Sequence, residues 1–293
     1  MYSTIIVPVD GTRPATAATL HGALLAQLLD AELRLLHVMP PEPAELSDIP
    51  ANRTADTDAD RAARRQAAEE AVAAAHEVTP SDAAPRVTEE ILEDSTLTGD
   101  TAARIIDYVT NQPDSFLVIG SRRLDDLHKV VLDSVSHTVL HKVPGPVTLV
   151  HGDDADKPQQ RLGDIILPVD GSAHADAAAG LAGALAEAAH ATVQLLHVIG
   201  ERDASVDPTT DPAFENTRAA LAERAITVYE HCVTSDHPAD AILEFASNAP
   251  ADSVIVMGRR GLGPIREKLL GSVSHKVVDR ATCPVTVIAS SRK

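Results

Sequence analysis

Short apolar runs alternate with longer segments rich in alanine and leucine along the whole chain. The apolar runs, such as residues 5–9 and 165–169, consist largely of Ile, Leu and Val. Continuous apolar strands that alternate with helices are typical of a parallel β-sheet covered by helices on both faces. We therefore predict an α/β fold of doubly wound parallel sheets, which bind ligands outside the carboxyl ends of their strands.

The pattern predicts the same succession of elements in each half of the chain. In the first half we expect strands at 5–9, 32–38, 86–92, 115–119 and 147–150, helices at 16–29, 58–78 and 99–111, and one more helix before the final strand. In the second half we expect strands at 165–169, 192–198, 227–234, 253–257 and 285–289, and helices at 175–189, 212–225, 238–248 and 272–279. The main difference is a segment rich in Pro and Asp at 40–60, which we interpret as a surface loop.

Four sequence matches recur in the same order in both halves. IIVPVDG at 5–11 returns as IILPVDG at 165–171, LLHV at 35–38 returns at 195–198, SVSH at 134–137 returns at 272–275, and PVT at 146–148 returns at 284–286. Ordered matches of this kind indicate an internal duplication. We therefore predict two tandem domains, at 1–152 and 163–293, joined by a polar linker at 153–162.

The composition narrows the range of partners. The chain carries 43 acidic and 25 basic residues, for a net charge of −18, so nucleic acid is not expected as a partner. An anionic ligand then needs local positive charge at its site. No segment is long and apolar enough to insert into a membrane, and the first residues lack a signal-peptide pattern, so we expect a cytoplasmic protein. We interpret Cys232 and Cys283 as small core residues rather than as a disulfide.

The segment 258–272, GRRGLGPIREKLLGS, has the pattern of a phosphate-binding loop between an apolar strand and an amphipathic helix. Glycines let the main chain approach a phosphate, and a helix N-terminus offers unpaired N–H groups and the positive end of a dipole. Ser272 is predicted to cap that helix and to offer its hydroxyl to a phosphate oxygen. The pattern favours a phosphate site over a purely structural turn. Basic residues would offset the acidic background there: Arg259, Arg260, Arg266 and Lys268.

At its glycines and its last serine, this segment resembles the universal stress protein family. That family carries the signature G-x2-G-x9-G-[ST], and the match is complete at Gly258, Gly261, Gly271 and Ser272. The PVD opening, the HV pair that ends the second strand and the final CPV strand extend the resemblance over both halves. The chain thus looks like a tandem member of the ATP-binding type. That resemblance implies a Rossmann-like fold similar to the adenine nucleotide alpha hydrolases.

The resemblance implies an ATP site in the second half. In ATP-binding members the Asp after the first strand lies by the nucleoside, and the residue ending the second strand meets adenine through its main chain. These roles fall on Asp170 and Val198, although Asp170 can also be interpreted as a helix cap. Asp170 could hold Mg²⁺ through water, but one carboxylate is weak support for a metal site. No catalytic or metal-ligating residue is predicted, and the predicted nucleotide-binding residues are Pro168, Val169, Asp170, Val198, Met257, Gly258, Arg259, Gly261, Gly271, Ser272, Val273 and Ser274.

The first half departs from the signature at two glycines. Arg123 stands in place of the second glycine and Asp133 in place of the third. The arginine would fill space that phosphates need, and the aspartate would put negative charge at a helix N-terminus. We therefore predict that the first half binds ATP weakly or not at all. An ion pair between the two side chains and independent drift are both open explanations.

Three functions remain open from the sequence. The favoured one is a cytoplasmic stress-response protein that binds ATP in its second half and acts as a nucleotide-dependent regulator or signalling module toward an unknown protein partner. Binding is favoured over turnover because no HxGH motif, Walker A motif, general base or nucleophile is evident, and His37 and His197 are interpreted as structural. The alternatives are a slow ATP hydrolase or adenylate-handling enzyme, and a nucleotide-free interaction adaptor.

The last strand of each half, at 147–150 and 285–289, would lie at a sheet edge, where strands seek partners. The resemblance implies strands of a kind that pair between protomers in the family, and we expect the two halves to pair in this way within one chain, as an intrachain pseudo-dimer. The sequence leaves open whether two chains then form a homodimer. It also leaves open whether ATP is preferred over ADP, AMP or a cyclic dinucleotide.

Overall fold

The structure is a computed structural model, and it describes residues 2–39, 58–81, 86–93, 100–122, 135–156, 158–201, 211–260 and 270–289. The surface loop predicted at 40–60 lies outside these residues except for its last three positions, which begin helix α3 (Asp58–Val78).

The predicted alternation of strands and helices is confirmed. The first half contains β1 (Thr4–Pro8), α1 (Arg13–Leu29), β2 (Glu32–Met39), α3 (Asp58–Val78), β3 (Arg86–Glu93), α4 (Thr101–Thr110), β4 (Ser115–Ser121), α5 (Val135–Lys142) and β5 (Val147–His151). The second half contains β6 (Asp164–Val169), α6 (Ala173–Ala189), β7 (Thr192–Ile199), the 3-10 turn η5 (Pro212–Phe214), α7 (Glu215–Leu221), β8 (Thr227–Thr234), α8 (Pro238–Ser247), β9 (Ser253–Gly258), α9 (Ser272–Arg280) and β10 (Val285–Ile288).

One predicted helix is shorter than expected. The segment 212–225 forms the turn η5 and then α7, which ends at Leu221. The N–H of Arg224 donates to the carbonyl of Leu221 at 3.1 Å, and the N–H of Ile226 donates to the carbonyl of Arg224 at 2.9 Å. The chain thus leaves the helix through a tight turn that leads directly into β8.

The ten described strands form one sheet in the order β3-β2-β1-β4-β5-β10-β9-β6-β7-β8. Strands are parallel within each half, whereas β5 and β10 pair antiparallel where the halves meet, with Thr148 opposite Thr286. The second half repeats the strand order of the first in reverse across this junction. The predicted fold, two doubly wound sheets joined as an intrachain pseudo-dimer, is therefore confirmed.

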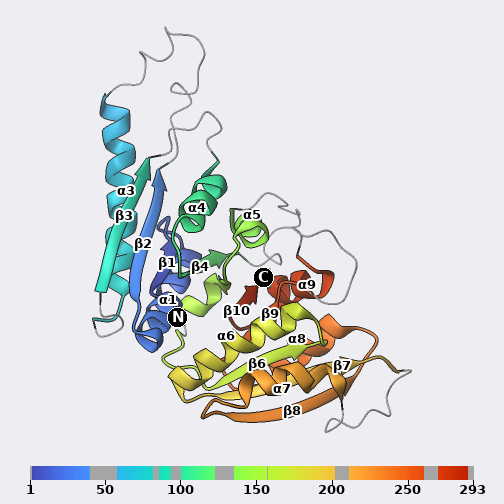
Figure 1. Ribbon diagram of the computed structural model, residues 1–293. Helices are drawn as coiled ribbons and strands as arrows, with labels where there is room; N and C mark the ends of the chain where they lie inside the picture. The colour runs from blue at the N-terminus through green and yellow to red at the C-terminus, as the bar shows by residue number, and fades with distance from the viewer. Residues whose placement is uncertain are drawn as a thin grey trace.

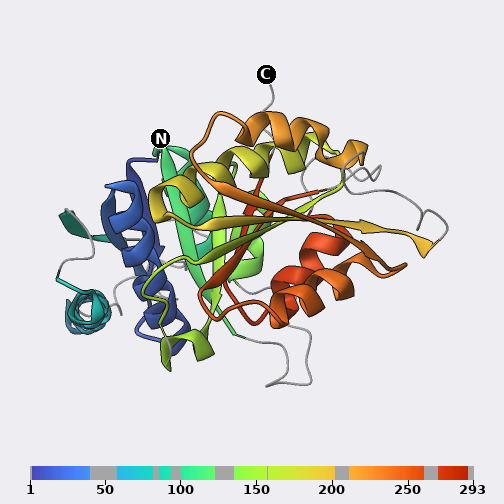
Figure 2. The same cartoon turned by 90° about the horizontal axis from the view of Figure 1, so that it is seen from below.

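Helices cover both faces of the sheet (Figure 1). In the second half, α6 and α7 lie on one face, and α8 and α9 lie on the other (Figure 2). Side chains of a strand alternate between faces: Ile5 and Val7 pack in one apolar core, and Ile6 packs in the other. Each core contains residues of both halves, so the two repeats share their interior.

The start of the predicted linker is folded onto the first half. Residues 152–156 form the 3-10 turn η2 (Gly152–Asp156). The Nε of Arg13, at the start of α1, donates to the carbonyl of Gly152 at 3.1 Å, and its guanidinium pairs with Asp156. This contact fixes the direction in which the chain leaves β5.

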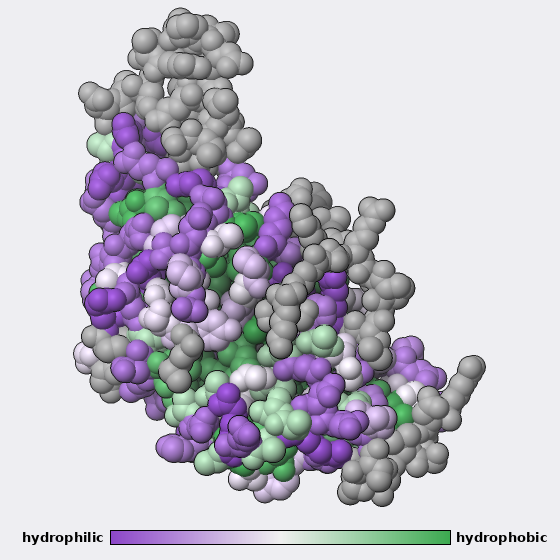
Figure 3. Space-filling model, viewed as in Figure 1, coloured by the Kyte–Doolittle hydropathy of each residue, from purple (hydrophilic) through white to green (hydrophobic). Residues whose placement is uncertain are grey.

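Hydrophilic residues prevail on the face of the molecule around α3, with apolar residues interspersed nearer the sheet (Figure 3). Among the described residues, the structure holds no helix with the length and apolar character needed to cross a bilayer.

Candidate functional site

A cavity of about 260 Å³ lies at the carboxyl ends of β6, β7 and β9. From β6 the chain continues to β7 on one side, and β9 occupies the other side, so this is the point where the strand order switches. Ligands of open α/β sheets bind at this point. The cavity is lined by Pro168, Val169, Asp170, Ala175, Leu196, His197, Val198, Pro238, Ile242, Met257, Gly258, Arg260, Gly271, Ser272, Val273 and Ser274.

The structure brings ten of the twelve predicted nucleotide-binding residues to this one cavity: Pro168, Val169, Asp170, Val198, Met257, Gly258, Gly271, Ser272, Val273 and Ser274. Gly261 lies outside the described residues, as do Arg266 and Lys268 of the same segment. Contact between these residues and a ligand stays a prediction.

Arg259 does not line the cavity, although it was predicted to bind the nucleotide. Its side chain is buried, with 5% of the residue exposed, and its guanidinium donates to the carbonyl of Val143 in the first half. Burial, together with the neighbouring charge of Arg260, lowers the pKa of Arg259 to about 10. Its side chain therefore joins the two halves, and Arg260 takes its place on the cavity wall.

Gly258 is required by packing against α6. A Cβ at this position would lie 2.7 Å from the carbonyl carbon of His174, which belongs to the first turn of α6. Real Cβ atoms do not approach a main-chain atom so closely, so only glycine lets β9 end beside this helix. A Cβ at the equivalent Gly120 of the first half would collide in the same way with the carbonyl oxygen of Pro14. The glycine at this position thus serves the packing of the strand against the helix in both repeats.

The N-terminus of α9 forms one wall of the cavity. Gly271 is the N-cap, with φ −67° and ψ 155°, and the helix starts at Ser272. Ser272 was predicted to be the cap, so that prediction is wrong by one residue, because the extended turn into the helix occurs at Gly271. The first intrahelical bond runs from the N–H of His275 to the carbonyl of Gly271 at 2.9 Å. The three preceding N–H groups, of residues 272–274, have no partner within the helix, and these residues line the cavity.

Ser274 has a structural contact of its own. Its hydroxyl is buried and donates to the carbonyl of Gly258 at 3.0 Å. This bond fastens the first turn of α9 to the end of β9, and it leaves the oxygen of Ser274 able to accept but not to donate.

Asp170 follows the last residue of β6, and its carboxylate accepts the N–H of Ser172 at 3.1 Å. The cap of α6 is Ser172, whose hydroxyl oxygen accepts the N–H of Ala175 at 3.3 Å. The interpretation of Asp170 as the helix cap is therefore wrong. Gly171 has φ +74°, a left-handed conformation that glycine adopts without strain. That turn places Asp170 on the cavity wall.

The main chain of Val198 faces the cavity. The carbonyl of Ile199 accepts the N–H of Ser235, on the β8 side, at 2.9 Å. Successive main-chain groups of a strand point to opposite neighbours, so the N–H and C=O of Val198 point toward β6. Pairing of β6 with β7 ends at Val169, opposite His197. Val198 therefore presents a donor and an acceptor just beyond the end of β6.

His197 lines the cavity and was not predicted to do so. Its Nδ1 lies 2.5 Å from Oδ2 of Asp211, a residue that is only 2% exposed. Burial alone would raise the pKa of Asp211, but the hydrogen bonds from His197 and from the N–H of Ala213 hold that pKa below its ordinary value. This pair fixes the orientation of the imidazole, in agreement with a structural histidine.

Positive charge gathers at the cavity despite the acidic chain. Burial lowers the pKa of His174, and the charges of Arg260 and Arg259 lower it further, whereas Asp170 raises it. The two guanidinium groups therefore contribute positive charge near the first turn of α6, and the carboxylate of Asp170 offsets part of it. Positive charge at this position favours an anionic ligand.

The sequence missed cavity residues that carry no motif. Pro238 and Ile242 come from α8, and Ala175 comes from α6. Leu196 and His197 directly precede Val198 in the repeated LLHV segment, and this repeat was the signal that could have identified them as cavity residues. In the first half, Arg123 and Asp133 lie outside the described residues, so their predicted effect on that site stays a prediction.

Known proteins share this organisation. The model of the universal stress protein family matches residues 1–151 and 162–289. A universal stress protein of Mycolicibacterium smegmatis is 32% identical over 97% of this chain and 96% of its own length. One from Mycobacterium tuberculosis is 27% identical over 98% of this chain and 97% of its own. The crystal structure of a universal stress protein from Archaeoglobus fulgidus has a TM-score of 0.71 at 22% identity, covers 98% of both chains, and shows the common fold.

Proposed function

Because the chain belongs to the universal stress protein family, we propose that its second half binds ATP in the cavity at the ends of β6, β7 and β9. In this proposal the bound nucleotide regulates the protein and is not its substrate. The observation that carries the proposal is the meeting, in one cavity, of the α9 N-terminus, Arg260 and the main chain of Val198.

The triphosphate would lie at the N-terminus of α9. The N–H groups of residues 272–274 and the helix dipole favour negative charge there, and Ser272 adds a hydroxyl. Arg260 supplies a positive side chain on the same wall. These groups overcome the general repulsion of an anion by a chain of net charge −18.

The adenine would lie between β6 and β7. Its N1 accepts a hydrogen bond and its amino group donates one, which matches the N–H and C=O of Val198. Guanine presents the opposite arrangement at these positions, and a buried mismatch of this kind is costly. Apolar side chains of Leu196 and Ile242 would contact the ring faces. Asp170, which follows β6 and lines the same cavity, would accept a hydrogen bond from a hydroxyl of the ribose.

One ATP per chain is expected, since the first half has lost two signature glycines to Arg123 and Asp133. In this proposal the first half has a structural role: it pairs with the second half through β5 and β10. ATP in the cavity would change the surface that the α9 N-terminus offers to a protein partner.

Calorimetric titration of the full chain tests the proposal. We expect saturation with one ATP, weaker binding of GTP by at least about tenfold, and no saturable phosphate release with or without Mg²⁺. No heat of binding at about 1 mM ATP, where even an affinity of roughly −4 kcal/mol is detectable, would favour the nucleotide-free adaptor. Saturable phosphate release that disappears in a Gly261→Val variant would favour the hydrolase.

A matched pair of variants at Ser272 separates the phosphate site from folding. Ser272→Asp should weaken ATP binding at least about tenfold, or 1.4 kcal/mol, while negative charge at a helix N-terminus stabilises the helix by about 0.3–1 kcal/mol. Ser272→Asn matches the Asp variant in size but carries no charge; because it also lacks the hydroxyl, its ATP affinity should lie between those of the wild type and of Ser272→Asp. Equal ATP affinity in both variants would contradict a phosphate position at this helix end.

A further inference from the structure

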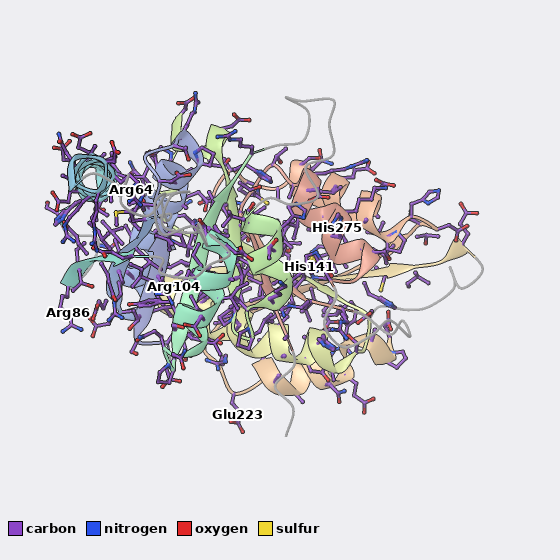
Figure 4. All side chains as sticks on the ribbon, turned by 90° about the horizontal axis from the view of Figure 1, so that it is seen from above. Arg64, Arg86, Arg104, His141, Glu223 and His275 are labelled. Carbon is purple, nitrogen blue, oxygen red and sulfur yellow. The ribbon has the colours of Figure 1, made fainter. Side chains whose placement is uncertain are left out.

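Four polar side chains meet where α5 of the first half packs against α9 of the second. His137 and His141 lie four residues apart on α5, and His275 and Asp279 lie four residues apart on α9, so each pair shares one face of its helix. The repeat makes His137 equivalent to His275, and His141 equivalent to Asp279. Figure 4 shows His141 and His275 on the two neighbouring helices.

The rings lie close together. Ring centroids are 5.3 Å apart for His137 and His275, 6.1 Å for His141 and His275, and 6.5 Å for His137 and His141. One ring nitrogen from each histidine lies within 4.8 Å of the corresponding nitrogens of the other two. Three imidazoles converge here from elements that are far apart in the chain.

Asp279 holds two of these rings. Its carboxylate is 9% exposed, and its oxygens lie 3.1 Å from Nε2 of His137 and 3.0 Å from Nδ1 of His275. The third ring is fixed by the main chain, since Nδ1 of His141 accepts the N–H of Leu270 at 3.2 Å. A carboxylate behind a histidine sets the ring orientation and raises the basicity of the imidazole, as it does in metal sites.

We propose that His137, His141 and His275 bind one divalent transition-metal ion of the Zn²⁺ class. Imidazole nitrogen suits Zn²⁺, Co²⁺, Ni²⁺ and Cu²⁺, whereas Mg²⁺ and Ca²⁺ prefer oxygen ligands. Asp279 stays behind the ligands and supplies a negative charge next to two of them.

The ion requires only local adjustment of the side chains. Zn–N bonds are about 2.0–2.1 Å long, which places tetrahedral ligands roughly 3.3 Å apart, so the three nitrogens have to approach one another by up to roughly 1.5 Å. The side chain of His275 is 42% exposed and that of His137 is 18% exposed, which leaves room for this movement and for a water molecule as fourth ligand. The charge of the nearby Arg259 opposes the cation, and Asp279 offsets it.

A metal at this position would link the two halves. α5 and α9 belong to different repeats, and α9 also supplies the helix end that lines the cavity of the second half. The inference stands independently of the nucleotide proposal, because none of the three histidines lines that cavity.

Titration with Co²⁺ and Zn²⁺ tests the site, with tag-free full-length chain that has been stripped by a chelator and contains no nucleotide. We expect one Co²⁺ per chain with the intense visible absorption of tetrahedral coordination by nitrogen, and its displacement by Zn²⁺. Zn²⁺ should also raise the melting temperature. Absence of this absorption, or binding too weak to saturate at millimolar metal, would overturn the proposal.

Three variants make the test specific. His141→Asn removes the ligand but keeps an acceptor for the N–H of Leu270, and it should abolish the Co²⁺ spectrum while the circular dichroism is unchanged. Asp279→Asn should weaken Zn²⁺ binding about 10- to 100-fold. The control, His76→Ala, changes a histidine on α3 that pairs with Glu89 and should bind metal as the wild type does. If His141→Asn binds metal as tightly as the wild type, the site is not the one proposed.

Discussion

Two glycines of one signature have different physical roles at the scale of the residue. A Cβ on Gly258 would meet the main chain of His174 at 2.7–2.8 Å, whereas the nearest atom to a Cβ on Gly271 is the Cα of Arg260 at 3.4 Å. Gly271 has φ −67°, which any residue adopts. Gly258 is therefore needed for the packing of β9 against α6, whereas Gly271 lies at the N-terminus of α9, where a side chain has room.

This difference predicts that the same substitution costs more stability at Gly258 than at Gly271. Gly258→Ala should lower the free energy of unfolding by about 1–3 kcal/mol, because a main-chain neighbour cannot move aside as a side chain does. Gly271→Ala should cost less than about 1 kcal/mol, the usual loss at an N-cap. Urea unfolding followed by circular dichroism measures both. Equal stability of the two variants would contradict the packing role of Gly258.

At the scale of the element, the junction of β5 and β10 places two threonines face to face. Oγ1 of Thr148 and Oγ1 of Thr286 lie 2.7 Å apart, and the residues are 0% and 3% exposed. The two residues are equivalent in the repeat and are directly opposite in the antiparallel register. The contact therefore lies on the pseudo-twofold axis and gives each hydroxyl a partner from the other half.

A double-mutant cycle measures this contact. Either Thr148→Val or Thr286→Val leaves one buried hydroxyl without its partner and should cost about 1–3 kcal/mol. The double variant replaces both with apolar groups of the same shape and should cost less than the sum of the singles, with a coupling of about 0.5–3 kcal/mol. Strict additivity would show that the two hydroxyls do not interact.

At the scale of the whole molecule, a buried histidine makes the joining of the halves sensitive to acid. His21 of α1 lines a small cavity together with Val150 of the first half and Cys283 of the second. The residue is 6% exposed, and burial lowers the pKa of His21 to about 4. In the unfolded chain the same ring titrates near its ordinary value of 6.5.

The unfolded state therefore binds more protons between pH 6.5 and pH 4, so stability falls as the pH falls through this window. Protonation of His21 should remove about 3 kcal/mol in total. The second half carries Leu181, which is 5% exposed, at the equivalent position, so His21→Leu is a natural replacement. In urea unfolding at pH 7.5 and 4.5, this variant should lose less stability than the wild type. An identical loss would mean that carboxylates alone cause the acid sensitivity.

Most of the fold could be inferred from local patterns. A strand that is buried on both faces of a sheet needs a continuous apolar run, so Ile5, Ile6 and Val7 directly predicted the first strand. The repeated segments predicted the duplication, and the succession of strand, glycine-containing loop and helix predicted the position of the cavity. Each of these signals arises from residues that are neighbours in sequence and are constrained together by one element.

Contacts between the two halves, across the pseudo-twofold axis, could not be predicted from local sequence patterns. The direction of Arg259 toward Val143, and the meeting of His141 with His275, depend on how α5 and α9 pack after β5 has paired with β10. The exposure of the Val198 main chain depends on where β6 stops beside β7. These features join residues that no local constraint links, so they exist only once the two halves have packed against each other.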